Sequence, residues 1–235
     1  MIGCLCLHGF TGSPEELQPL TERLQRKKGW LVYTPVLPGH GVGEDIGEAE
    51  GAKWIYTADR AAKEMLKHVD ELYVIGFSMG GMLACYLAAK YPVKKLVLLN
   101  AAAYYVNRPQ MVQDLVASYR GSENPWLDLV IDKRKETPMT AFYQFIKTIR
   151  LMRPFVEGVT SPVMIGQGMK DILVPEKSAT YLFEQIGSKN KTLRMYEHSN
   201  HFLCHDVEQE LVIRDVEHFL KGFHHENQTS ATVYL

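Results

Sequence analysis

The sequence predicts an α/β protein in which a mostly parallel sheet carries helices on both faces. Short apolar runs such as Ile2–Leu7 and Leu72–Phe77 lack the polar alternation of a half-exposed strand, so both of their faces are expected to be buried. Helix-length segments with apolar residues at helical spacing separate these runs. Strands that alternate with helices favour a parallel sheet covered on both sides.

The elements of the first half follow in a regular order. The apolar strand Ile2–Leu7 stops at His8-Gly9, and a helix opens at Ser13, where a cap residue, a proline and two acids favour initiation. That helix ends near Gly29. Further segments are expected as the β-rich strand Trp30–Leu37, a helix with apolar residues from Trp54 to Val69, the buried-type strand Leu72–Phe77, the alanine-rich helix Met79–Tyr91 and the strand Lys95–Leu99.

The second half interrupts this alternation and then resumes it. Residues 104–154 show helices and loops without a convincing strand, which indicates a small helical cap inserted into a core formed by residues 1–103 and 155–222. After the insertion we expect strands at Val163–Ile165 and Leu193–Tyr196 and helices at Lys177–Ile186 and Val207–Lys221. The polar tail, residues 223–235, is expected to be flexible.

Composition narrows the class of protein. The chain has 235 residues and a net charge of −1 with histidine neutral, which gives no sign of a nucleic-acid surface. We expect no integral membrane segment and no secretory signal. The four cysteines form neither a zinc pattern nor a disulfide framework, and Cys4 and Cys6 should face the same side of a strand. Reduced thiols in a cytoplasmic protein are therefore expected, and the oligomeric state is open.

A nucleophile is predicted at Ser78. Gly76-Phe77-Ser78-Met79-Gly80 is a G-x-S-x-G motif that follows a strand and opens a helix. In that setting the turn holds the serine in a strained conformation with its hydroxyl exposed above the sheet. The alternative is a glycine-rich turn with a passive serine.

A serine hydroxyl needs a base and an acid that orients the base, in the chain order Ser, acid, His. Asp171 follows the strand Val163–Ile165 and is the expected acid, although it could instead be a turn residue or the cap of the next helix. Asp206 is its competitor and is expected to cap the last helix. His201, in the middle of the loop after the last strand, is the expected base, with His198 and His205 as the other candidates.

Two backbone N–H groups are expected to stabilise the oxyanion: that of Met79, after the nucleophile, and that of Phe10, in the turn after the first strand. His8 is expected to tie down neighbouring loops. A metal site built from His198, His201, Cys204 and His205 is disfavoured, because a strand, a loop and a helix would scatter these ligands and no acid interleaves them.

The motifs 8–12, 38–41, 76–81 and 199–201, together with Asp171, resemble those of the α/β-hydrolase superfamily in order and spacing. The resemblance covers nearly the whole chain and is greatest to small bacterial carboxylesterases related to monoacylglycerol lipases. It implies an α/β-hydrolase fold with a small cap and no cofactor. These enzymes usually carry glycine before the catalytic histidine, where this chain has Asn200; asparagine is the other residue that best tolerates positive φ.

The resulting hypothesis is a serine carboxylesterase that acts on small-molecule esters with short-to-medium acyl chains, monoacylglycerols included. Side chains of Phe10, Met79, Phe142, Phe145, Ile146 and Ile149 are expected to bind substrate; alternatively, the apolar stripe of the cap, which also includes Met152, only packs on the sheet. Thioesterase, amidase, acyltransferase and carbon–carbon hydrolase chemistry would use the same triad. A dehalogenase would need aspartate at position 78. A non-enzymatic ligand-binding protein of this fold is the alternative from another class.

Overall fold

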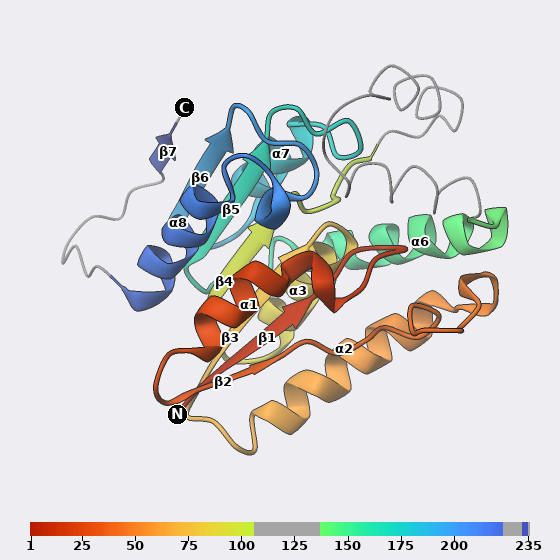
Figure 1. Ribbon diagram of the computed structural model, residues 1–235, viewed down its shortest axis with the longest axis horizontal. Helices are drawn as coiled ribbons and strands as arrows, with labels where there is room; N and C mark the ends of the chain where they lie inside the picture. Colours follow the sequence, from red (N-terminus) through yellow and green to blue (C-terminus); the bar gives the residue numbers. More distant parts are fainter. Residues whose placement is uncertain (106–136, 223–231, 235) are drawn as a thin grey trace.

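A single parallel sheet forms the centre of the protein (Figure 1). The computed structural model describes residues 1–105, 137–222 and 232–234. Its sheet has the strand order β2-β1-β3-β4-β5-β6-β7, and every neighbouring pair is parallel. The strands are β1 (Ile2–Leu7), β2 (Trp30–Tyr33), β3 (Glu71–Phe77), β4 (Val93–Leu99), β5 (Val163–Gly168), β6 (Lys191–Tyr196) and β7 (Thr232–Tyr234). The predicted fold class is confirmed.

Helices cover both faces of this sheet. They are α1 (Gln18–Gln25), α2 (Gly51–Met65), α3 (Met79–Lys90), α6 (Met139–Met152), α7 (Lys177–Gln185) and α8 (Gln209–Lys221), with short 3₁₀ helices η1 (Pro14–Leu17), η2 (Ile46–Glu48), η3 (Arg153–Phe155) and η4 (Leu203–His205). Helices α1 and α8 lie together on one face (Figure 1), and α2, α3 and α7 contribute to the core on the other. In the described residues no helix is both long and apolar enough to cross a bilayer.

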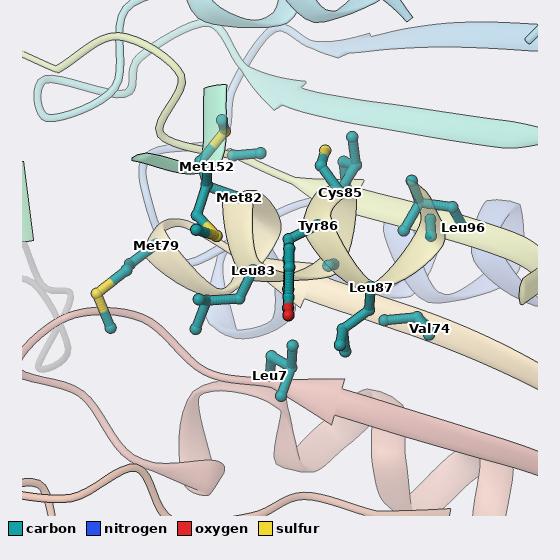
Figure 2. Packing of buried hydrophobic residues seen from close by; sticks show 14 of the residues in the cluster. Leu7, Val74, Met79, Met82, Leu83, Cys85, Tyr86, Leu87, Leu96 and Met152 are labelled. Carbon is teal, nitrogen blue, oxygen red and sulfur yellow. The ribbon is translucent and has the colours of Figure 1, made fainter. Parts of the chain in front are cut away.

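The two core layers follow from the alternation of side chains along each strand. Leu5 and Leu7 of β1 pack with α2 and α3, whereas Cys4 and Cys6 point to the layer under α1 and α8. Helix α3 is apolar on nearly all sides and is buried along most of its length between the sheet and α6 (Figure 2). Cys4 and Cys6 share one face of β1, as expected, and all four cysteines are buried.

A buried carboxylate joins α2 to α3 on the same side of the sheet. Asp59 of α2 accepts hydrogen bonds from Lys90 at 2.6 Å, Tyr91 at 2.7 Å and Tyr86 at 3.0 Å, and it pairs with Lys63 at 2.9 Å. Burial alone would raise the pKa of Asp59, but the bonds from Lys90, Tyr91, Lys63 and Tyr86 outweigh burial and hold that pKa well below its usual range.

Several boundaries differ from the predicted ones. Strand β2 ends at Tyr33 rather than Leu37, since Pro35 has no N–H to continue the ladder. The first helix begins as the 3₁₀ turn η1, whose N-cap Ser13 makes no side-chain cap bond, and α1 ends at Gln25, short of Gly29. Residues 232–234 of the expected flexible tail form β7 beside β6. The rest of that tail lies outside the described residues.

The expected cap is described only at its two ends, because residues 106–136 lie outside the described residues. Its second part is α6, which packs against α2, α3 and η2. Phe145, Ile149 and Met152 are buried on this helix, whereas Phe142 and Ile146 are partly buried against the same core. Helix α6 therefore covers the end of α3 that carries the G-x-S-x-G turn.

Candidate active site

The candidate site lies at the carboxyl ends of the strands, where ligands of open parallel sheets bind. The loop after β1 holds Phe10, the turn after β3 holds Ser78, and the loops after β5 and β6 hold Asp171 and His201. Ser78 and His201 line one pocket, together with Phe10 and the backbone of Gly9. The fold thus brings the predicted nucleophile and base from segments more than 120 residues apart to one place.

Ser78 sits at a strained turn between β3 and α3. Its φ is 52° and its ψ is −118°, a conformation that non-glycine residues rarely adopt. The turn is held on both sides, because the N–H of Ser78 donates to Leu99 and its carbonyl accepts from Gly81 and Ala102. Glycine is required at position 80, where a Cβ would lie 2.1 Å from the carbonyl oxygen of Leu7. These are the features that the motif predicts for a nucleophile elbow.

Asp171 and His201 are directly joined. The Nδ1 atom of His201 lies 2.7 Å from Oδ2 of Asp171, and the carboxylate is fully buried. The other oxygen, Oδ1, accepts from the N–H groups of Leu173 at 2.8 Å and Val174 at 2.9 Å. An ionised carboxylate can only accept, so Nδ1 carries the proton and Nε2 is left with a free lone pair. This tautomer suits a general base.

The competing acid, Asp206, has a different place from the one predicted. Helix α8 begins at Gln209, so Asp206 does not cap it with its side chain. Its carboxylate instead accepts from the N–H groups of Asn200 at 2.6 Å and Val207 at 2.8 Å. Because the chain turns back through η4 before the helix starts, Asp206 braces the loop that carries His201.

The other two histidines of this loop, His198 and His205, do not bond to Asp171. The Nε2 atom of His205 lies 2.7 Å from the carbonyl oxygen of Glu15, and burial lowers the pKa of His205 although that bond opposes the shift. The side chain of His198 is exposed. Burial raises the pKa of the Cys204 thiol to about 12, with Cys6 and Glu16 adding to the shift. Within the described ranges no three or more His, Cys, Asp or Glu side chains gather as a metal site.

Asn200, the residue before His201, does not adopt the positive φ that asparagine tolerates. Among described non-glycine residues, positive φ occurs at Thr11, Ser78 and Asn100, and not at Asn200. The loop is shaped instead by hydrogen bonds to its backbone, from Asp206 on one side and from Asn100 on the other.

Two backbone N–H groups, those of Met79 and Phe10, are the donors expected for an oxyanion, and both belong to segments next to Ser78. The N–H of Met79 is the first of α3, and a first-turn N–H has no acceptor within its own helix. The N–H groups that flank Phe10 are both taken, that of Gly9 by Glu16 at 2.8 Å and that of Thr11 by His40 at 3.1 Å. The N–H of Phe10 itself donates to none of the described residues.

Two histidines hold this turn in place. His8 Nε2 accepts the N–H of Leu37 at 3.0 Å, so its Nδ1 donates to the carbonyl of Gly9. His40 Nε2 accepts from Thr11, so its Nδ1 donates to the carbonyl of Pro38. The expectation that His8 ties down neighbouring loops agrees with these bonds.

Aromatic and aliphatic side chains make up much of the lining of the pocket that contains Ser78. Its lining consists of Gly9, Phe10, Thr11, Glu16, Phe77, Ser78, Ala102, Tyr105, Phe145, Leu173, Val174, His201 and Phe202. The rings of Phe10 and Phe145 stack, with centroids 4.9 Å apart and planes 15° apart. Burial raises the pKa of Tyr105, so its phenol stays neutral at physiological pH.

Of the side chains expected to bind substrate, only Phe10 and Phe145 are among those that line this pocket. Met79 and Ile149 are fully buried in the core, Met79 at the start of α3 as Figure 2 shows. The ring of Phe142 lies next to that of Phe145, with centroids 5.9 Å apart. Both Phe142 and Ile146 are partly buried against the core. The apolar stripe of α6 thus has two roles, because only Phe145 among its residues lines the pocket that Ser78 lines, while the others pack in the core.

Several lining residues were missed by the sequence analysis. Leu173 and Val174 lie two and three residues after the acid Asp171, and this position could have suggested them. The sequence predicts Glu16 only as an acid at the start of a helix, yet its carboxylate is buried, lines the same pocket as Ser78 and accepts the N–H of Gly9. Nothing local in the sequence indicates that this side chain turns inward.

The chain is similar to known proteins over most of its length. The family model of the alpha/beta hydrolase fold matches residues 5–148, and that of serine aminopeptidase S33 matches residues 131–208. The chain is similar to a thermostable monoacylglycerol lipase of Bacillus sp. (strain H-257), with 29% identity over 94% of this chain and 91% of the relative. A carboxylesterase of Bacillus subtilis (strain 168) is 26% identical over 92% and 91%.

A solved structure has a similar fold. It is described as one of LipS and LipT, two metagenome-derived lipolytic enzymes, and it superposes with a TM-score of 0.77 at 25% identity over 94% of each chain. Since the first family model covers more than half of the chain, this protein belongs to the α/β-hydrolase fold family.

Proposed function

We propose that the protein is a serine carboxylesterase that hydrolyses short-to-medium acyl esters, monoacylglycerols included, through an acyl-enzyme intermediate. One observation carries the proposal: Ser78, at a strained turn, lines the same pocket as His201, whose imidazole is oriented by Asp171. Ester hydrolysis is also the activity that the names of the relatives indicate.

The first half of the proposed reaction forms the acyl-enzyme. Nε2 of His201 takes the proton of Ser78 as its oxygen attacks the ester carbonyl. Asp171 stabilises the resulting imidazolium through the Nδ1 bond, and the N–H groups of Phe10 and Met79 stabilise the negative oxygen. The imidazolium then protonates the alkoxide of the alcohol, the carbon–oxygen bond breaks, and the alcohol leaves.

The second half repeats these steps with water. Nε2 of His201 removes a proton from a water molecule as that water attacks the acyl carbon. When the second tetrahedral intermediate collapses, the proton returns to the oxygen of Ser78 and the carboxylic acid departs. No metal or cofactor takes part in this scheme, since imidazole carries every proton that moves.

The preference for short-to-medium chains rests on the wall of the pocket. Phe10, Tyr105 and Phe145 place three rings near Ser78, with Leu173 and Val174 beside them. Each methylene buried against such a wall contributes about 0.8 kcal/mol until the space is filled. We therefore expect kcat/KM to rise over the first added methylenes and then to fall.

Amide hydrolysis is the second candidate, because the serine aminopeptidase model matches a segment that contains both Asp171 and His201. The same triad would serve, and the departing group would be an amine. The first candidate is favoured because the two curated relatives named above are a lipase and a carboxylesterase that align over more than nine tenths of this chain.

One panel of substrates tests both candidates. Purified protein is assayed with p-nitrophenyl esters from acetate to palmitate, with monoacylglycerols of matched chain lengths, and with aminoacyl p-nitroanilides, using Ser78→Ala as the blank. We expect ester cleavage with a maximum below palmitate. Cleavage of anilides alone would favour the amidase, and a maximum at palmitate or longer would contradict the pocket argument but not the triad.

A further inference from the structure

Asn100 is a fully buried polar residue immediately after β4 that the proposed chemistry does not use. Its φ is 43°, in the left-handed region that asparagine tolerates better than most side chains. Buried amides are costly unless their donors and acceptor are bonded. The partners of this amide therefore show what the residue is there for.

The amide bridges the two loops that carry the proposed acid and base. Its Oδ1 accepts the N–H of Gly168 at 2.8 Å, three residues before Asp171. Its Nδ2 donates to the carbonyl oxygens of Asn200 at 3.0 Å and His201 at 2.8 Å. Each function of the amide is used, and none of its bonds goes to solvent.

The backbone around Asn100 reaches the proposed nucleophile as well. The N–H of Asn100 donates to Gly166 of β5 at 2.8 Å. Its neighbours Leu99 and Ala102 bond to the N–H and the carbonyl of Ser78, each at 3.0 Å. The segment from Leu99 to Ala102 therefore contacts the backbone of all three loops.

The acid loop and the histidine loop lie so close together at Gly168 that a side chain there could not take over the bridging role of Asn100. A Cβ on Gly168 would lie 2.5 Å from the carbonyl oxygens of both Ser199 and Asn200. The carbonyl oxygens of Ser199 and Asn200 thus lie against the acid loop, and that of Ser199 accepts the N–H of Lys170 at 3.0 Å. The amide of Asn100 supplies donors to Asn200 and His201 and takes the N–H of Gly168.

We infer that Asn100 is a positioning residue that sets the distance and orientation of His201 relative to Asp171 and Ser78. The inference rests on the proposed function. Asn100 does not line the pocket, so it should not contribute to substrate binding. Loss of its amide should lower kcat and leave KM nearly unchanged, because misalignment of reacting groups by about 1 Å can cost about a hundredfold in rate.

Two variants separate the amide from the backbone. Asn100→Gly removes the side chain and keeps a residue that tolerates positive φ. Asn100→Asp keeps the shape and the acceptor for Gly168, fills the same volume so that folding is not lost to a cavity, and turns an oxygen toward the carbonyls of Asn200 and His201. Both are expected to lower kcat.

Ser178→Ala is the matched control. Ser178 is also fully buried, and its hydroxyl donates to Ala101 at 2.5 Å and accepts from Tyr104 at 3.1 Å. The control thus removes two buried hydrogen bonds from the same segment without touching the acid or histidine loop. A merely structural role for Asn100 predicts the same kinetic effect in both proteins.

The experiment measures kcat and KM on one p-nitrophenyl ester, the melting temperature, and the far-downfield proton NMR signal of the His201 Nδ1–H. The expected result is a fall in kcat of about tenfold to a hundredfold in both Asn100 variants, with KM within about twofold. The NMR signal should move or broaden in these variants. In Ser178→Ala, kcat and the signal should match the parent even if the melting temperature falls.

Three outcomes overturn the inference: kcat within about twofold of the parent in the Asn100 variants, an equal loss of kcat in Ser178→Ala, or an unchanged NMR signal. The NMR signal does not depend on turnover. If the parent hydrolyses esters and Ser78→Ala does not, while the Asn100 variants keep full kcat, this inference fails and the proposed function stands. If Ser78→Ala keeps its activity, the proposed function itself fails.

Discussion

The imidazole of His201 donates its Nδ1–H to Oδ2 of Asp171 across 2.7 Å, while the opposite oxygen of that carboxylate accepts two backbone N–H groups. The carboxylate is therefore fixed on both sides, and it fixes the ring and its tautomer in turn. Nε2 of His201 remains available for proton transfer in the pocket that Ser78 lines.

Asp171→Asn is expected to lower kcat by about 10⁴, because an amide at this position can donate to the ring and favour the wrong tautomer. Asp206→Asn is the matched control, since Asp206 also touches the histidine loop but bonds only to backbone N–H groups. Its loss should be far smaller. Steady-state kinetics on one ester decide the matter, and equal losses would mean that Asp171 is not the acid of the triad.

Hydrolysis is expected to need no metal ion, since the imidazole of His201 carries every proton that moves in the proposed reaction. EDTA should leave the rate unchanged at every pH. His198→Gln, at an exposed histidine of the same loop, should leave the rate unchanged as well. Inhibition by EDTA that zinc reverses would instead support a metal site in this loop.

Phe145→Ala and Ile149→Ala, both on α6, should have different effects. Phe145 lines the pocket, so its loss should change the ester chain length at which kcat/KM is greatest. Ile149 is fully buried in the core, so its loss should lower the free energy of unfolding by about 2–5 kcal/mol and leave the chain-length profile unchanged. A profile that shifts only in the Ile149 variant would refute this division of the helix.

Asp59→Asn is expected to lower the free energy of unfolding at pH 7 by about 1–3 kcal/mol, because the charged hydrogen bonds to Lys90 and Lys63 are lost. The pKa of Asp59 is held below its unfolded value, so its contribution is complete above that value, about 3.9, and is lost as pH falls toward the folded pKa. The difference between parent and variant should thus shrink below about pH 4. Urea unfolding at several pH values measures it, and a constant difference down to pH 3 would argue against the assignment.

The sequence was sufficient for the features that depend on local pattern. Continuous apolar runs predicted strands β1 and β3, because a strand buried on both faces has no polar alternation. The motif Gly76 to Gly80 predicted the strained turn at Ser78, because the conformation of such a short turn depends on the residues of the motif itself.

Features that depend on distant partners were not accessible in the same way. Asn100 contacts Gly168 and Asn200, which lie 68 and 100 residues further along the chain. The place of Asp206 depends on the turn η4, which postpones the start of α8. The strand β7 consists of three residues at the end of a polar tail, too few to show the alternation of a strand, so its pairing with β6 was not predicted.

The most direct test of the account is covalent labelling of Ser78. The protein is treated with a fluorophosphonate and digested, and the modified peptide is identified by mass spectrometry, in parallel with kcat for Ser78→Ala. The account predicts stoichiometric modification of Ser78, loss of hydrolysis in step with labelling, and a fall in kcat of about 10⁴ to 10⁶ in the variant. Modification at another residue, or a variant that keeps activity within about tenfold of the parent, would contradict it.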